Sequence, residues 1–154
     1  TYPIIHIATH AQFGTIPENT FIVTGQKKKL IISQLEEILR STPKGFGFIE
    51  LLSLSACETG SGDDRATLGL AGIALQAGVK SSIASLWSIN DESTSILISE
   101  FYRNLRNKNT SKAKALQQAQ IKLIKASDGK TPGIKSEYAK PGYWSPFILI
   151  GNWL

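Results

Sequence analysis

Residues 48–60, FIELLSLSACETG, decide the fold class of this chain. Phe48–Ser55 is short and mostly apolar, which predicts a buried strand, and the rest of the stretch is the polar loop that leaves it. Upstream, Tyr2–Ala8 (YPIIHIA) predicts another buried strand that ends at a polar step. We therefore expect His10 to follow the first core strand directly and Cys57 to follow the second.

Predicted strands and helices alternate along the rest of the chain. Ser33 and Glu36 have the spacing of a capping box, so we expect a helix from Ser33 that ends before Pro43. The further predicted elements are a hairpin (Phe21–Val23 with Leu30–Ile32), strands (Val79–Leu86, Pro146–Ile150), helices (Leu68–Gln76, Asp91–Leu105, one from Ser111) and a polar loop (Ser127–Gly142). This alternation predicts an α/β layer fold with a mostly parallel sheet, whose functional groups gather at the carboxyl ends of the strands.

Composition narrows the functional classes. The chain has 154 residues, 19% of them charged and 42% hydrophobic, as expected for one globular domain. It shows no signal peptide, and no apolar run approaches the roughly 20 residues needed to cross a bilayer. We therefore expect a cytoplasmic protein without membrane contact. The net charge of +5 comes largely from Lys27–Lys29 and from residues 103–125. No aromatic residues are interleaved with these lysines, so we expect a solvated surface that does not require contact with nucleic acid.

Cys57 is the single cysteine, which excludes an internal disulfide and a multi-cysteine zinc site. A free thiol has a pKa of about 8.5, so a nucleophilic cysteine needs a neighbouring base such as imidazole. Parallel neighbouring strands would bring His10 and Cys57 together, and backbone N–H groups of the loop could face an oxyanion. The alternatives are a buried, inert Cys57 and structural histidines. We expect His6, in mid-strand, to be such a structural residue.

Segments along nearly the whole chain carry a family resemblance. They are HIATH (6–10), LSLSACETG (52–60), GLAGIALQAGV (69–79), SIASLWSINDE (82–92), FY (101–102), AKALQQAQ (113–120) and YWSPFILIGNW (143–153). In this order they closely resemble the CHAT domain, a family of the caspase/separase clan of cysteine peptidases that commonly follows tetratricopeptide repeats. The resemblance implies a caspase-like three-layer sandwich and a cysteine peptidase that needs neither cofactor nor metal.

The resemblance also implies a role for individual residues. Cys57 would attack the scissile carbonyl of a protein substrate, and His10 would activate the thiol or protonate the leaving amine. The backbone N–H groups of Ala11 and Cys57 would hold the oxyanion. The clan usually has glycine where this chain has Ala11, which keeps the N–H but visits positive φ less easily.

Members of the clan that cut after Lys or Arg use an acidic residue at the base of the specificity pocket. Asp63, Asp64 and Asp91 are the candidates here, and Trp87 would form a pocket wall. Their alternatives are loop solvation for the aspartate pair, helix N-terminal charge for Asp91 and core packing for Trp87. Where the family often has Gly-Glu-Gly, this chain has Thr67–Gly69 without the acidic member.

The resemblance further implies that 1–154 is a single CHAT domain, the C-terminal portion of a longer polypeptide. The family's strands ahead of the histidine strand are missing, which would leave that strand as an open sheet edge. We expect an upstream repeat region, a regulatory partner or another copy of the chain to cover it. The alternative to an enzyme is a catalytically silent caspase-like interaction module. A nucleotide-binding domain is disfavoured, because Gly60 and Gly62 are followed by Arg65 and no Walker sequence occurs.

Overall fold

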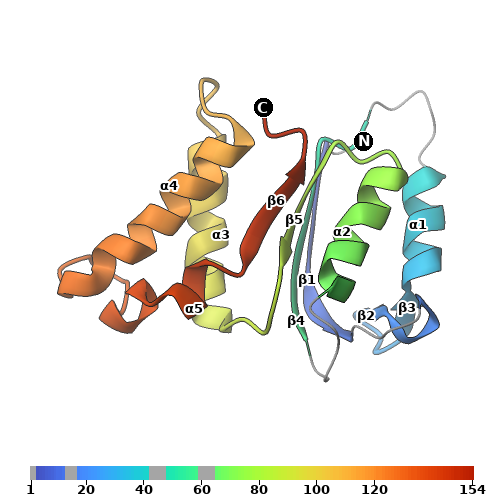
Figure 1. The fold of residues 1–154 in the computed structure, drawn as a ribbon, viewed down its shortest axis with the longest axis horizontal. Helices are drawn as coiled ribbons and strands as arrows, with labels where there is room; N and C mark the ends of the chain where they lie inside the picture. The colour runs from blue at the N-terminus through green and yellow to red at the C-terminus, as the bar shows by residue number, and fades with distance from the viewer. Residues whose placement is uncertain (1–2, 13–16, 42–47, 59–64) are drawn as a thin grey trace. The chain divides into compact units, whose positions relative to one another are not determined.

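The computed structural model describes residues 3–12, 17–41, 48–58 and 65–154 (Figure 1). It divides the chain into two compact units. Unit 1 comprises Thr1–Ser88 with Ile150–Asn152, and unit 2 comprises Ile89–Leu149 with Trp153–Leu154.

A six-stranded sheet of order β3-β2-β1-β4-β5-β6 confirms the predicted α/β fold. Its strands are β1 (Ile4–Gln12), β2 (Phe21–Val23), β3 (Lys29–Ile31), β4 (Leu51–Glu58), β5 (Ser81–Ser85) and β6 (Phe147–Gly151). The β1–β4 and β4–β5 pairs are parallel, whereas β1–β2 and β2–β3 are antiparallel. The sheet is therefore mixed, with its parallel pairs in the part that carries His10 and Cys57.

The prediction that the histidine strand forms a sheet edge is wrong. β1 lies between β4 and β2, because the β2–β3 hairpin folds back and pairs Ala11 with Ile22. The outermost strand on this side is β3, which is three residues long and carries Lys29, and both features discourage edge-to-edge association. The expected homo-oligomer through the histidine strand therefore loses its structural premise.

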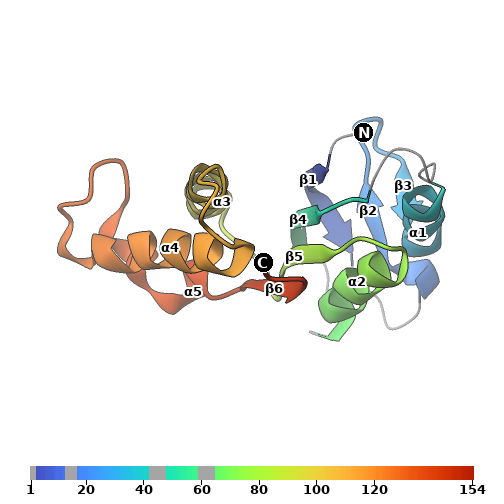
Figure 2. The same cartoon turned by 90° about the horizontal axis from the view of Figure 1, so that it is seen from above.

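Helices α1 (Ile32–Arg40) and α2 (Arg65–Gln76) lie on one face of the unit 1 sheet (Figures 1 and 2). Beneath them lies an apolar core whose buried members include Ile22, Ile32, Leu35, Leu39, Leu52, Leu54, Ala74 and Val79. The predicted N-cap at Ser33 is wrong, because the observed N-cap is Ile31, two residues earlier. The helix begins at Ile32, and the side chain of Gln34 accepts a hydrogen bond from the N–H of Ile31 at 3.2 Å.

Unit 2 is built on two long helices, α3 (Asp91–Leu105) and α4 (Lys112–Lys125), which lie side by side in both views. Both helices begin close to where they were predicted, and side-chain caps fix the two starts. Asn90 accepts from the N–H of Ser93 at 3.0 Å, and Ser111 accepts from that of Lys114 at 3.2 Å. The predicted loop Ser127–Gly142 instead contains short helical turns, η2 (Ala126–Asp128), η3 (Ser136–Ala139) and the start of α5 (Pro141–Trp144). Within the described ranges, no helix combines the length and apolarity needed to span a membrane.

An ion pair ties the η3 turn to the start of α3 within unit 2. Lys135 Nζ donates to Glu92 Oε2 at 2.6 Å. The hydrogen bond from Lys135, with one from Tyr138, lowers the pKa of Glu92 below its ordinary value of 4.5, and Glu92 in turn raises the pKa of Lys135. Both side chains are more than half exposed, so the pair is a modest, solvent-screened link.

We predict that Lys135→Met makes unit 2 less sensitive to acid. A carboxyl whose pKa is lowered by folding adds stability above its unfolded pKa, and this stability is lost as the pH falls through the lowered folded pKa. Without Lys135 the folded pKa of Glu92 moves closer to the unfolded one, since only the hydrogen bond from Tyr138 still lowers it. The thermal midpoint should therefore fall less between pH 7 and pH 3 than in the wild type. Lys130→Met is the control, and equal pH dependence of Lys135→Met and wild type would contradict the prediction.

Candidate functional site

The register of β1 and β4 makes His10 and Cys57 direct neighbours. The two strands pair in parallel from Ile4 opposite Leu51 onward, and this register brings His10 opposite Cys57. Adjacent strands are about 4.8 Å apart, and residues paired in this way share a face of the sheet. The backbone thus places a base and a nucleophile at adjacent positions, although the side chain of Cys57 lies outside the described part of the structure.

Both residues lie inside their strands, and the expectation that each follows its strand is wrong. β1 continues to Gln12 and β4 to Glu58. The extension has a tertiary cause: Ala11 pairs with Ile22 on one side and with Glu58 on the other, so ladders on both sides hold a polar stretch extended. His10 and Cys57 therefore have backbone positions fixed by the sheet.

The alternation of β1 decides which face carries the site. Ile5 and Ile7 pack against the core beneath α1 and α2, and Ala11 belongs to that core. Residues at the intervening positions, including His6 and His10, lie on the opposite face. His10 is exposed there. The histidine and cysteine positions thus occupy the face of the sheet that α1 and α2 leave uncovered.

The other predicted site residues fall in different places. Ala11 is 1% exposed and paired on both sides, so its N–H can face an oxyanion only where the ladder opens. Trp87 follows β5 and is 41% exposed, too much for the alternative of core packing. Asp91 opens α3 in unit 2, where a carboxylate also favours the helix N-terminus. Asp63 and Asp64 lie outside the described residues.

Sequence reasoning gave His6 no specific partner, but the structure gives it one. His6 Nε2 lies 3.2 Å from Ser55 Oγ, a hydrogen bond that crosses from β1 to β4. Burial lowers the pKa of His6 below its ordinary value of 6.5. The sequence does indicate that His6 and His10 share a face of the strand, because they are four residues apart and an even spacing in a strand places both side chains on one face.

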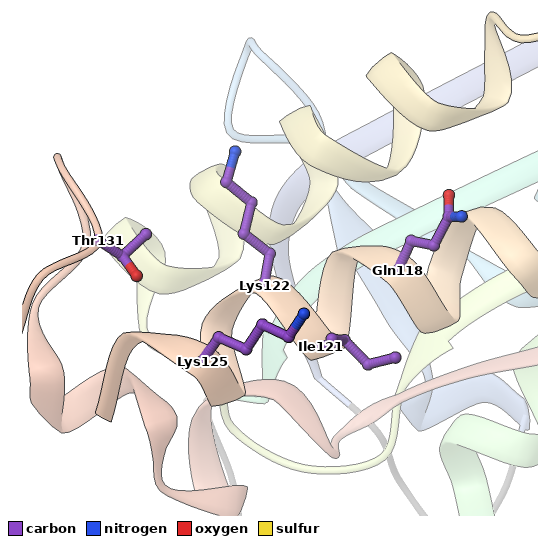
Figure 3. A pocket seen from close by; sticks show the side chains of 5 residues that line it. All are labelled: Gln118, Ile121, Lys122, Lys125 and Thr131. Atoms are coloured by element: carbon purple, nitrogen blue, oxygen red, sulfur yellow. The ribbon is translucent and has the colours of Figure 1, made fainter. Parts of the chain in front are cut away.

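A cavity of about 340 Å³ opens on α4 in unit 2 (Figure 3). Its lining consists of Gln118, Ile121, Lys122, Lys125 and Thr131. Lys122 Nζ forms an ion pair with Glu100 Oε2 at 2.6 Å, and Figure 3 shows the two lysine ammonium groups pointing in different directions. The polar groups therefore do not converge on one ligand atom. Among the described residues, no three His, Cys, Asp or Glu side chains gather as a metal site.

Comparison with known proteins places this geometry in a family. No curated protein matches the chain. The family model described as the CHAT domain matches residues 1–152, nearly the whole chain, and so includes both strands that carry His10 and Cys57. The chain therefore belongs to the CHAT domain family, a relative of the caspase-like cysteine peptidases.

Proposed function

We propose that this chain is the peptidase domain of a cysteine endopeptidase, with Cys57 as nucleophile and His10 as general base and acid. The observation that carries the proposal is the register of the parallel β1–β4 pair, which makes these two residues neighbours in a chain of the CHAT family. A dyad on paired strands needs no movement of loops to bring base and nucleophile together. Its substrate is a protein segment, and its chemistry uses no cofactor.

The reaction follows from the two groups. His10 takes the thiol proton of Cys57 while the sulfur bonds to the scissile carbonyl carbon, and the carbonyl oxygen becomes an oxyanion. When the C–N bond breaks, His10 returns the proton to the leaving amine and a thioester remains. Water, activated by His10, then hydrolyses the thioester and regenerates the thiol. Backbone N–H groups of Cys57 and Ala11 are the proposed oxyanion donors.

Specificity and regulation complete the proposal. We assign Asp63, Asp64 or Asp91 as the acid that selects a Lys or Arg side chain, and Trp87 as a pocket wall. The exposure of Trp87 supports its role as a pocket wall. Trp87 follows β5, and because β5 runs parallel to β4, the carboxyl ends of the two strands point in the same direction. An upstream tetratricopeptide-repeat region or a regulatory partner would control the activity in the cytoplasm.

One observation favours a second candidate function, a catalytically silent interaction module. Ala11 stands where the clan usually has a glycine, and its backbone lies buried between two ladder partners, Ile22 and Glu58. An N–H engaged in a sheet ladder does not stabilise an oxyanion. A chain locked in this state would keep the fold and a binding surface without turnover.

We predict that a peptidyl acyloxymethyl ketone with a terminal Arg forms one covalent adduct on the protein, measured by intact mass. Cys57→Ala should form none, and His10→Ala should react at least tenfold more slowly, because the thiol loses its base. A matched probe with a terminal Asp should react more slowly if an acidic pocket selects the substrate. No adduct on the wild type, with Cys57 still alkylated slowly by iodoacetamide, would favour the silent module.

A further inference from the structure

The hydrogen bond between His6 and Ser55 does not join residues that are opposite each other. In the β1–β4 register, His6 pairs with Ser53, whereas Ser55 pairs with Ala8. The imidazole therefore reaches diagonally, toward the carboxyl ends of the strands, to place its Nε2 atom 3.2 Å from Ser55 Oγ. Ala8 bears only a methyl group at the intervening position and leaves room for the ring.

The diagonal bond anchors β4 just before Cys57. Ser55 precedes the cysteine by two residues, about 7 Å along the strand and on the same face. His6 precedes His10 by four residues, about 13 Å, which is too far for proton exchange between the two imidazoles. Any influence of His6 on Cys57 therefore acts through Ser55 and the backbone of β4.

Ser53 shows that a hydroxyl on this face does not acquire such a partner automatically. It lies on the same strand and the same face, directly opposite His6. Its Oγ is buried, yet it has no hydrogen-bond partner within the described part of the chain. The ring of His6 thus bonds the serine nearer to Cys57 and bypasses the serine beside it.

Partial burial favours the uncharged form of the His6 ring, which is the form suited to this role. Its pKa is lowered below 6.5, which favours the uncharged imidazole with one donor and one acceptor nitrogen. A neutral ring can bond the Ser55 hydroxyl without placing a fixed positive charge on the face that carries His10. The bond therefore ties β1 to β4 without adding a charge beside His10.

We propose that His6 is a positioning residue that holds Cys57 in register with His10 through its hydrogen bond to Ser55. The inference rests on the proposed dyad, because a register matters to reactivity only if His10 acts on Cys57. The chain offers a matched pair of variants. Ser55→Ala removes the hydrogen bond, and Ser53→Ala removes a hydroxyl of equal size from the same strand and face that makes none.

The test measures the rate of Cys57 alkylation by iodoacetamide from pH 5 to 10. Ser55→Ala and His6→Leu should lower the rate at pH 7 about tenfold and move the midpoint toward the free-thiol value of about 8.5, because a small misplacement weakens the base–nucleophile contact. Ser53→Ala should match the wild type. His6→Gln should recover most of the rate, since its amide nitrogen can bond the same hydroxyl.

A second readout separates this inference from the proposed function. Amide hydrogen exchange at residues 56–58 should be about tenfold faster in Ser55→Ala and His6→Leu than in the wild type or Ser53→Ala, because the anchor is lost. Unchanged exchange and unchanged alkylation in both Ser55→Ala and His6→Leu would overturn the positioning role. A wild-type alkylation profile that His10→Ala leaves unaltered would instead overturn the dyad.

Discussion

Cys57→Ala is expected to lower the hydrolysis of a peptide with a scissile bond after Arg by at least about 10³-fold. The chain contains a single cysteine, so no other thiol can take over the covalent step. The fold should survive, because alanine keeps the β4 backbone and its pairing with β1. The measurement is kcat/KM for a fluorogenic peptide, with thermal unfolding as the check on folding.

His10→Ala should lower the same kcat/KM by about 10²–10⁴-fold, the range for a lost general acid–base group. His6→Gln is its control, because it alters the other histidine of the same strand face while keeping the bond to Ser55. Retention of more than half the activity in His10→Ala would refute His10 as the base. Loss of activity in His6→Gln equal to that in His10→Ala would mean that the effect is not specific to the imidazole of His10.

The sequence predicts the bounds of an element correctly where caps and apolar spacing within that segment determine them. The helix from Asp91 to Leu105 was predicted with its observed bounds, because the Asn90 cap and the apolar spacing are encoded within that segment. The strands that carry His10 and Cys57 were predicted to end too early, at Ala8 and Ser55, whereas they continue to Gln12 and Glu58. Their ends depend on partners far along the chain, Ile22 for Ala11 and Ala11 for Glu58, and no local pattern reports such pairing.

Part of the candidate site was likewise predictable from the sequence, and part depends on strand register. That His10 and Cys57 come together followed from two parallel strands, but their direct pairing depends on register, and a slip of one residue would place them on opposite faces. The bond from His6 to Ser55 depends on the same register and on the small size of Ala8. The position of β1 inside the sheet was missed because the hairpin that flanks it returns from later in the sequence.

Gly151→Ala is expected to destabilise the protein by about 2–5 kcal/mol, through backbone strain and overpacking together. Gly151 ends β6 with φ of 94°, a conformation that costs an alanine about 1–2 kcal/mol. A Cβ atom here would collide with the carbonyl oxygen of Lys80 and lie 2.8 Å from Leu75 Cδ2. The same carbonyl accepts the N–H of Asn152 at 2.8 Å, so relief of the clash would break the hydrogen bond between Asn152 and Lys80, the residue before β5.

Gly78→Ala separates the two causes, because Gly78 has nearly the same φ, 96°, and no described atom lies within 4 Å of its Cβ position. It should therefore show the backbone cost alone, about 1–2 kcal/mol in urea unfolding. The excess loss in Gly151→Ala measures how tightly β6 closes against the start of β5. Equal losses in the two variants would mean that Lys80 and Leu75 yield without cost, and that β6 is not held closely at this edge of the sheet.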